Sequence, residues 1–456
     1  MSQTRTIAGP GLASKIKDRL IQQALERRAQ AIDEEEMRRT ARATTPPAGT
    51  PASDVPEAWS RFDQHPGYQR YKLIRDGARK IGIANPFFQL QEGVSGATVQ
   101  IEERECINFS GYNYLGLCGH PEVNRAAADA IAEFGTSVSA SRIVSGERRI
   151  HRELERELAD LYQTDDCLVM VSGHATTVTT LGYLFGPRDL IVHDAFIHNC
   201  AVEGAKLSGA KRLSFPHNDW QALDNILQRC RHEHERVCVV IEGLYSMDGD
   251  FPDLPKFIEV KNRHRAFLMV DEAHSLGVMG ARGHGIHEHF NIPPSGVDIW
   301  MGTLSKALAG CGGYIAGEHA LIDNLRHAAP GFVYSVGMPP PVAAASLAAL
   351  HLMRSDPERV QRLHEAGARF LAKARDLGID TGLSAGFSII PAITGSSLRA
   401  ARLSHALRGH GINASPILYP AVSEKAARLR FFMCSEHTGE QIDRTLDALA
   451  LEWSKN

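Results

Sequence analysis

The residues whose chemistry is most readily inferred lie in the segment 298–317, DIWMGTLSKALAGCGGYIAG. The apolar run 299–301 predicts a short buried strand, and Lys306 follows it just before a run of small residues and a pair of glycines. A lysine at the point where a buried strand gives way to a glycine loop is partly desolvated, and desolvation favours the neutral amine. A neutral amine can attack a carbonyl and form a Schiff base. An exposed loop lysine is the alternative, and other residues must decide between the two.

A carboxylate and a histidine follow a second apolar run. Asp271 comes directly after residues 266–270, AFLMV, and His274 lies three residues further on. A buried carboxylate costs free energy unless it meets a cation or several hydrogen-bond donors. One interpretation is a metal site in which the nearby His284, His287 and His289 join this pair. Their loop is glycine-rich and has no apolar framework, so we predict no metal site.

The other interpretation joins Asp271 to Lys306. A pyridine nitrogen kept protonated by the carboxylate, with an aldehyde carbon condensed on the amine, is the arrangement that pyridoxal 5'-phosphate (PLP) requires. That cofactor also needs a phosphate cradle. Gly173, His174 and Ala175 follow an apolar run and open a helical stretch, whose backbone N–H groups and dipole can receive an anion. Thr303 could add a hydroxyl from the opposite side. Acid, cradle and lysine together predict PLP as the cofactor.

The elements that must position these residues indicate an α/β fold. Short apolar runs alternate with helical stretches, and polar residues fall where the runs end; the runs are 168–171, 190–192, 237–241 and 266–270. Such runs are typical of a mostly parallel sheet that is covered on both faces. Ligands bind outside the carboxyl ends of the strands in such a sheet. We therefore expect a large α/β domain to carry the site.

The two ends of the chain have different patterns. Residues 12–42 predict a charged amphipathic helix, and a proline-rich linker follows it. From residue 339 to about 375 an alanine-rich helical pattern runs on, and the strand-like pieces 388–390, 416–418 and 429–433 come after it. This is the pattern of a smaller α+β domain. We expect four parts: the charged helix and linker (1–58), the start of the catalytic body (59–115), the large domain (116–338) and the C-terminal domain (339–456).

Composition excludes several classes of function. The chain has 456 residues and a formal net charge of −3, which gives no global field to attract nucleic acid or an anionic membrane. No apolar run is long enough to span a membrane, and the segment MSQTRTIAGPG lacks the apolar core of a secretory signal. The eight cysteines include no C-x-x-C pair, which favours reduced thiols over a disulfide framework. We expect a cytoplasmic protein.

Successive motifs resemble those of the α-oxoamine synthases, a group of fold-type I PLP enzymes. They are NYLG at 113–116, EGLYSMDG at 242–249, DEAHSLG at 271–277, GTLSKA at 302–307, YS at 334–335, MPP at 338–340, RLR at 428–430 and EHT at 436–438. The resemblance covers about residues 60–450. It implies a homodimer with the active site at the subunit interface. It also implies a PLP-dependent decarboxylative condensation of an α-amino acid with an acyl thioester, giving an α-amino ketone, CO2 and a free thiol.

The resemblance also implies a role for each matching residue. Lys306 would form the Schiff base with the cofactor and move protons at the substrate Cα, while Asp271 would pair with the pyridinium nitrogen. His274 would hydrogen-bond the phenolic oxygen of the ring. His198 would stack on the ring face. Ser246 matches a residue near that oxygen. Arg430 matches the arginine that binds the substrate carboxylate.

Two positions depart from the commonest family pattern. Some members have an asparagine two positions before the tyrosine of the YLG motif, whereas this chain has Tyr112, followed by Asn113. A tyrosine there adds bulk and a hydroxyl near the amino-acid or acyl pocket. The second departure is Val336, where relatives commonly carry Thr or Ser and the neighbouring subunit contacts phosphate. Because valine cannot donate a hydrogen bond from its side chain, that contact is in question.

The acyl donor is either coenzyme A or an acyl carrier protein. The serine-rich segment 135–142 resembles family members of secondary-metabolite assembly lines, which take acyl groups from carrier proteins. Carrier proteins are acidic, so the basic residues of the N-terminal helix could attract one; they are Lys15, Lys17, Arg19, Arg27 and Arg28. Two alternatives remain: different PLP chemistry on the same fold, such as an aldolase or an aminotransferase, and a non-catalytic partner subunit.

Overall fold

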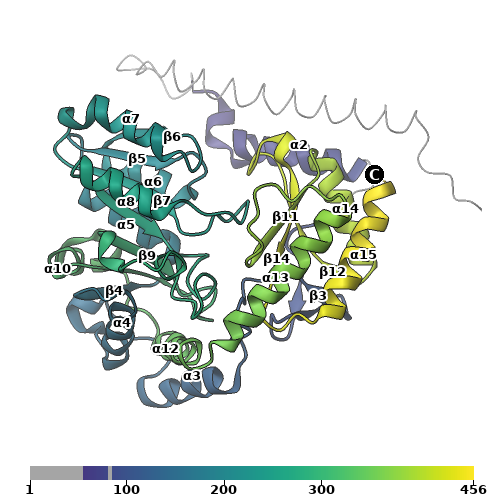
Figure 1. Ribbon diagram of the computed structural model, residues 1–456, viewed down its shortest axis with the longest axis horizontal. Helices are drawn as coiled ribbons and strands as arrows, with labels where there is room; N and C mark the ends of the chain where they lie inside the picture. Colours follow the sequence, from purple (N-terminus) through teal and green to yellow (C-terminus); the bar gives the residue numbers. More distant parts are fainter. Residues whose placement is uncertain (1–54, 81–84, 456) are drawn as a thin grey trace, which may run out of the picture.

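The computed structural model describes residues 55–80 and 85–455 (Figure 1). The predicted helix 12–42 and its linker lie outside the described residues. The first described α-helix is α2 (Pro66–Lys80), which has no buried residue.

The body of the molecule is a seven-stranded sheet with the order β4-β10-β9-β8-β7-β5-β6. Its strands are β4 (Asp166–Met170), β5 (Leu190–Asp194), β6 (Lys211–Phe215), β7 (Val237–Glu242), β8 (Phe267–Asp271), β9 (Ile299–Thr303) and β10 (Gly313–Gly317). The strands from β9 to β6 are parallel, whereas β10 runs antiparallel to both β9 and β4. The four predicted apolar runs and the run 299–301 are confirmed as strands. The apolar runs did not predict β6, which is mostly exposed at the edge of the sheet, or β10.

Helices cover both faces of this sheet, as Figure 1 shows. One face packs against α5 (Gly173–Leu184), α6 (Asn199–Ser208) and α10 (His319–Ala328). The other packs against α4 (Arg149–Tyr162), α7 (Trp220–Cys230) and α8 (Leu254–Arg263). Along β5, Ile191 joins the first of these cores, and its neighbours Leu190 and Val192 join the second. Because both faces are buried, every position of such a strand is apolar, which explains the unbroken runs in the sequence.

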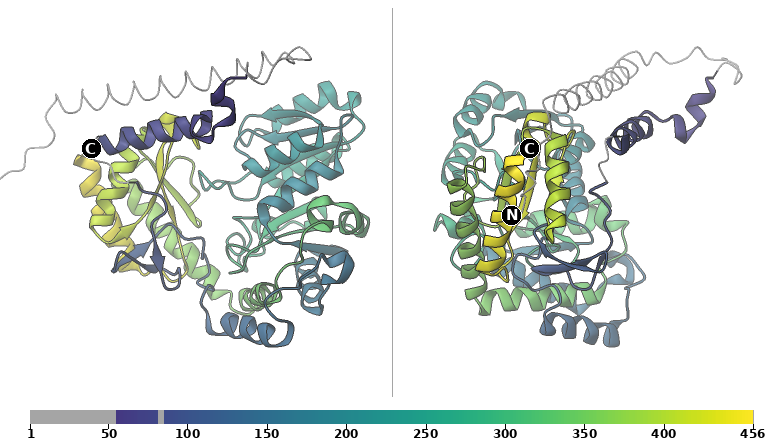
Figure 2. Two further views of the ribbon diagram at one scale, coloured as in Figure 1. Left: turned by 180° about the vertical axis from the view of Figure 1, so that it is seen from behind. Right: turned by 90° about the vertical axis from the view of Figure 1, so that its right-hand side faces the viewer.

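The C-terminal part has a second sheet of three antiparallel strands in the order β11-β14-β13. The strands are β11 (Ile389–Ile393), β13 (Ser415–Ile417) and β14 (Arg428–Phe432). Beside them lie α13 (Glu358–Asp376), α14 (Ser397–Gly409) and α15 (Gly439–Lys455) (Figures 1 and 2). A four-stranded sheet combines β1 (Gln91–Glu92), β2 (Thr98–Ile101) and β3 (Arg104–Asn108) with β12 (Ile412–Asn413). The start of the body is thus paired with the C-terminal part through the parallel strands β3 and β12.

The long helical pattern after residue 339 is two helices, which corrects the prediction of one. They are α12 (Pro340–Ser355), which packs on α3 (Pro121–Phe134) and α4, and α13. Between them Asp356 has φ −124° and ψ 72°. The proline at position 357 disfavours the helical conformation of the residue before it, so the helix ends there. The break lets α12 stay with the large sheet while α13 continues into the C-terminal part (Figure 1).

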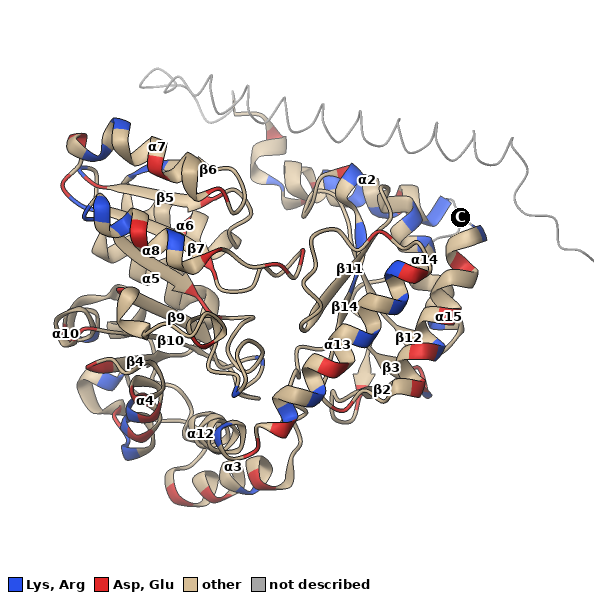
Figure 3. Cartoon of the chain, in the orientation of Figure 1, with Lys and Arg blue, Asp and Glu red and all other residues tan. Residues whose placement is uncertain are grey.

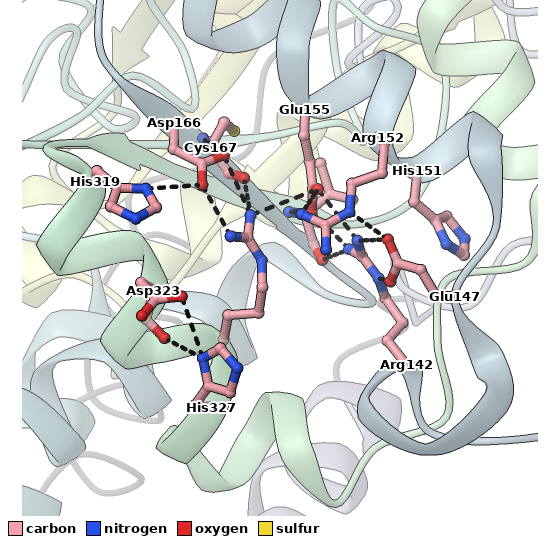
Figure 4. Close-up of polar contacts among 12 residues, drawn as sticks. Arg142, Glu147, His151, Arg152, Glu155, Asp166, Cys167, His319, Asp323 and His327 are labelled. Carbon is pink, nitrogen blue, oxygen red and sulfur yellow. Dashed lines mark hydrogen bonds and ion pairs between the residues drawn. The ribbon is translucent and has the colours of Figure 1, made fainter.

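A buried network of ion pairs fixes the segment after α3 to the large sheet (Figure 4). Arg142 is buried and pairs with Glu155 of α4 at 2.6 Å and with Glu147 at 2.6 Å. Arg326 of α10 pairs with Asp166 of β4 at 2.8 Å and with Glu155 at 3.8 Å. These contacts hold Arg142, at the end of the serine-rich segment, against α4, and they join α10 to β4.

Charged residues of both signs are mixed along the outer helices α7, α8, α13 and α15, as Figure 3 shows. No helix among residues 55–80 and 85–455 is long and apolar enough to cross a membrane. Within those same residues, no group of His, Cys, Asp and Glu side chains could hold a metal ion.

Candidate active site

A cavity enclosing about 400 Å³ of empty space, part of it open to solvent, lies at the carboxyl ends of the large sheet's parallel strands. Its lining includes seven residues that the sequence predicted as site residues: Gly173, His174, His198, Asp271, His274, Thr303 and Lys306. Four more lining residues, Cys200, Glu242, Ala273 and Met301, were not predicted. The parallel strands end together at this edge, which brings residues from distant parts of the sequence to one place.

Lys306 lies in the turn after β9. Burial lowers its pKa to about 8, although the negative charges of Asp271 and Glu242 act in the opposite direction. Its Nζ atom is 5.7 Å from the centroid of the Tyr112 ring. At a pKa of about 8, a substantial fraction of the amine is neutral near neutral pH, as attack on a carbonyl requires.

Asp271 is the last residue of β8, and its side chain is buried. Burial raises its pKa, and the positive charge of Lys306 opposes that shift. One carboxylate oxygen accepts the backbone N–H of Ala273 at 2.9 Å. Next to it, burial holds the pKa of His274 well below its usual range, so that imidazole is neutral. The Nδ1 atom of His274 lies 2.7 Å from the hydroxyl of Tyr114.

Glu242 is a second buried carboxylate in the cavity wall. It ends β7, and burial together with the neighbouring Asp271 raises its pKa to about 8. Its oxygens accept the backbone N–H groups of His198 at 2.7 Å and Ser246 at 3.2 Å. The signal that identified Asp271, a carboxylate directly after an unbroken apolar run, was equally present here and would have found it.

Cys200 is the neighbour of His198 in the cavity. Its Sγ atom lies 3.0 Å from Nδ1 of the histidine, and burial raises the pKa of the thiol to about 12. The thiol is therefore protonated at neutral pH. Burial also lowers the pKa of His198.

The proposed phosphate cradle is the N-terminus of α5. Ser172 caps this helix by accepting the N–H of Ala175 at 3.3 Å, and Ala175 does not line the cavity. Thr303 lies opposite, and its hydroxyl donates to the carbonyl of Gly312 at 2.8 Å. A Cβ atom on Gly173 would lie only 2.7 Å from Oγ1 of Thr303, so this approach needs glycine.

Arg430 lies on β14 of the C-terminal part and does not line the cavity. Its Nη1 atom donates to the carbonyl of Ser246 at 2.8 Å, and its guanidinium lies 4.5 Å from the centroid of the Phe432 ring. The Nε atom is buried without a hydrogen-bond partner among the described residues. Phe432 in turn lies parallel to the ring of His274, at 6.3 Å and 8°.

The other predicted residues lie at the margin of the site. Tyr112 is exposed, and its ring packs edge-on against Phe432 at 4.8 Å. The side chain of Asn113 is occupied elsewhere: it donates to the carbonyl of Ser95 at 3.1 Å and accepts the N–H of Cys118 at 3.0 Å. Neither Asn113 nor Ser246 lines the cavity, and the contacts of Ser246 described above use its backbone.

The donor set fits PLP. A desolvated amine, a buried carboxylate and the N-terminus of a helix face one cavity, where Gly173 and His174 of that helix end line the wall. The candidate holders are Lys306, Asp271 and the start of α5.

Comparisons with known proteins agree with this arrangement. The family described as aminotransferase class I and II matches residues 104–449. An 8-amino-7-oxononanoate synthase of Exiguobacterium sibiricum is 38% identical over 382 residues, which cover 84% of this chain and 97% of that protein. A putative 8-amino-7-oxononanoate synthase of a Cyanothece species is 36% identical over 392 residues, which cover 84% of this chain and 96% of that protein.

Solved structures are also similar. The serine palmitoyltransferase of Sphingomonas wittichii superposes with a TM-score of 0.81 at 28% identity, covering 85% of this chain and 97% of that one. Another serine palmitoyltransferase structure, which contains PLP, has a TM-score of 0.81 at 27% identity, covering 85% of this chain and 97% of that one. The chain therefore belongs to the class I and II aminotransferase family and, within it, to the PLP-dependent α-oxoamine synthases.

Proposed function

We propose that this protein condenses an α-amino acid with an acyl thioester to give an α-amino ketone, CO2 and a free thiol. The observation that carries the proposal is the meeting of Lys306, Asp271, His274 and His198 at one cavity, with Arg430 of the C-terminal part nearby. Relatives named as 8-amino-7-oxononanoate synthases and structures named as serine palmitoyltransferases support it, because both kinds of enzyme perform this type of condensation.

PLP supplies a ring that accepts electrons and so makes the Cα–H bond of an attached amino acid acidic. The amine of Lys306, neutral in part at its pKa of about 8, takes the proton from Cα and returns one after CO2 has left. With PLP bound, Asp271 would accept a hydrogen bond from the pyridine nitrogen and keep it protonated. Because burial raises the pKa of Tyr114, its hydroxyl stays protonated and donates to Nδ1 of His274. The N–H on the opposite ring nitrogen of His274 is then free to donate to the phenolic oxygen.

Arg430 binds the carboxylate of the amino acid. A guanidinium offers two parallel N–H donors to a carboxylate, and its position above Phe432 restricts its rotation. The Cα atom forms its new bond to the carbonyl carbon of the thioester as the C–S bond breaks, and the departing thiolate takes a proton from solvent while Lys306 keeps the one from Cα. Loss of CO2 and reprotonation at Cα complete the balance.

The test compares the wild-type protein with Lys306→Ala. Wild-type protein loaded with PLP should show the visible absorption of a protonated Schiff base, and it should release amino ketone and CO2 only when both amino acid and thioester are present. Lys306→Ala should lose that absorption and the activity. An aldolase or an aminotransferase would consume the amino acid without thioester, and a non-catalytic subunit would release no amino ketone.

We further propose that the thioester is carried by an acyl carrier protein. The basic residues between Lys15 and Arg28 support this, and so do the exposed Lys72, Arg79 and Lys80 of α2, because carrier proteins are acidic. Deletion of residues 1–50 should raise the KM for a carrier-bound acyl group several-fold, with no change for a small thioester mimic. Equal effects on both donors would contradict docking.

We also propose a homodimer with the site at its interface. Val336 forms a backbone bridge with Ser141, and exposed apolar side chains gather around it: Ile143, Val144, Tyr334 and Val336. A contiguous exposed apolar surface is typical of a protein interface. The backbone around Val336 is held in place by the bridge, so any contact to a partner's phosphate there would come from N–H groups and not from the side chain.

A further inference from the structure

Outside the cavity, a buried histidine lies between two carboxylates. Nδ1 of His217 is 2.9 Å from Oδ1 of Asp194, and Nε2 is 2.8 Å from Oδ2 of Asp250. The side chain of His217 is 10% exposed, that of Asp194 0% and that of Asp250 11%, so all three are shielded from water. Burial alone would lower the pKa of His217, but hydrogen bonds to Asp194 and Asp250 raise it to about 10. The imidazole is therefore doubly protonated at neutral pH and donates to both carboxylates.

The Asp194 side of this cluster fixes the turn that leads to His198. Asp194 ends β5, and its Oδ1 atom also accepts the N–H of Phe196 at 2.7 Å. The ring of Phe196 stacks on that of His217 at 4.4 Å and 26°. Two residues after Phe196, the backbone N–H of His198 donates a hydrogen bond to the carboxylate of Glu242 at 2.7 Å. The turn 194–198 is thus held at its start by Asp194 and at its end by Glu242.

The Asp250 side fixes the loop that holds Arg430. The carbonyl of Asp250 accepts the N–H of Tyr245 at 2.8 Å, which closes the loop 245–250. Within this loop, the carbonyl of Ser246 accepts Nη1 of Arg430 at 2.8 Å. The carboxylate of Asp248 pairs with Arg428 of the same strand at 2.7 Å. The position of the loop therefore sets the position of two arginines of β14.

We propose that His217 is a positioning residue that links the turn of His198 to the loop of Arg430 through its two charged hydrogen bonds. This inference rests on the proposed roles of His198 and Arg430. A neutral imidazole has a single N–H and can donate to one carboxylate only, whereas an imidazolium donates to both. Charge-assisted hydrogen bonds are also about twice as strong as neutral ones. The cation thus keeps the turn of His198 and the loop of Arg430 in a fixed relation.

The experiment compares His217→Gln with His264→Gln in the full-length protein loaded with PLP. His264 is a matched control: its Nε2 atom pairs with Asp224 at 2.7 Å and its side chain is 12% exposed, but it lies between α7 and α8, outside the cavity lining. The common amino acids are titrated into each protein while the absorption of the bound cofactor is followed. For the amino acid that wild type binds best, His217→Gln should weaken binding about 10- to 100-fold, as expected for loss of alignment at an active site. His264→Gln should bind like wild type.

A second variant, Asp250→Asn, tests the same link in case His217→Gln does not fold. It retains the histidine but removes one charged partner, so it should weaken amino-acid binding in the same direction and by a smaller factor. A His217→Gln protein that melts at a lower temperature but binds the amino acid as wild type does would reduce His217 to a structural role and overturn the proposal. Equal losses in His217→Gln and His264→Gln would overturn it as well.

The titration also separates this inference from the proposed reaction. If wild type binds an amino acid but forms no amino ketone with thioester, the proposed reaction fails, and the comparison of affinities still decides the role of His217. If no amino acid alters the absorption of the wild-type protein, both the proposed function and the inference are overturned.

Discussion

The amine of Lys306 is buried beside the carboxylates of Asp271 and Glu242, and their opposing effects set its protonation. Burial favours the neutral amine, and the two negative charges favour the ammonium. Burial prevails, which lowers the pKa of Lys306 to about 8. A fraction of the Lys306 amine is therefore neutral near neutral pH. The amine still lies close to Asp271, which we propose pairs with the pyridine nitrogen.

The first prediction concerns the rate at which the apoprotein captures PLP. Only the neutral amine attacks the aldehyde, so the rate should rise with pH and level off above about 8, the pKa of Lys306. Well below that value the neutral fraction falls about tenfold for each unit of pH. The growth of the Schiff-base absorption after rapid mixing measures the rate, and Lys306→Ala provides the baseline. A rate independent of pH between 6 and 9, roughly the range where the neutral fraction changes most, would show that a different group controls capture.

The second prediction concerns Arg430. In Arg430→Lys the charge remains but the paired donors are lost, so the KM for the amino acid should rise about tenfold or more, with a smaller change in kcat. Steady-state kinetics at saturating thioester measure both constants. Arg369→Lys is the control, because Arg369 pairs with Asp443 at the surface at 2.5 Å. An unchanged KM in Arg430→Lys would remove this residue from the carboxylate site.

At the scale of the elements, the site depends on where the strands end. β7, β8 and β9 end at Glu242, Asp271 and Thr303, so three neighbouring parallel strands contribute consecutive positions of the cavity wall. The helix α5 begins beside them, and its free N–H groups face the same side. A small change in the spacing between α5 and β9 would therefore alter the phosphate cradle and leave the acid in place.

The third prediction tests that spacing with Gly173→Ala. The added Cβ atom would lie 2.7 Å from Oγ1 of Thr303, which would force α5 and β9 apart. We expect the affinity for PLP to fall about tenfold or more, with little change in kcat once the protein is saturated with cofactor. Gly409→Ala in α14 is the matched control, since its Cβ would meet no atom within 4 Å. Equal affinities for PLP in Gly173→Ala and wild type would contradict the cradle.

At the scale of the whole molecule, all the residues that line the cavity belong to the large domain, and the C-terminal part adds Phe432 beside His274 and Arg430 beside Phe432. The pairing of β3 with β12 and the helix α13 connect the two parts (Figure 1). The ion pairs of Arg142 hold the segment that carries Ile143 and Val144 (Figure 4). The backbone bridge between Ser141 and Val336 joins this segment to the one that carries Val336. If this surface is the proposed dimer interface, a second copy would bind it with little cost for loop ordering.

The fourth prediction tests that surface with Val144→Asp. A charge at a buried interface costs free energy, so this variant should shift the protein from dimer to monomer and lower the activity together with it. Sedimentation velocity at several concentrations measures the assembly state. Leu451→Asp in α15 is the control, because it places the same charge on an exposed apolar position of the C-terminal helix. A Val144→Asp protein that remains dimeric would place the interface elsewhere.

The sequence by itself determined the α/β class, the cofactor and most of the cavity wall. Strands that are buried on both faces must be apolar throughout, so each run and the polar residue that ends it can be read without coordinates. The family motifs then fixed which of these residues belong together. Glu242 carried the same signal as Asp271 and could have been recognised on that basis.

Only the tertiary structure decided which side chains face the cavity and which support it from behind. Ala175 and Asn113 were predicted as site residues, yet neither lines the cavity: the N–H of Ala175 serves a helix cap and the amide of Asn113 holds a loop. His217 is far in sequence from His198 and Arg430, and nothing in its local pattern distinguishes it from a surface histidine. Asp194 and Asp250 stabilise its protonated form by raising its pKa. The order of strands β7, β5 and β6 brings these two carboxylates to its two ring nitrogens. Strand order depends on how the whole sheet packs, and a local stretch of sequence carries no record of it.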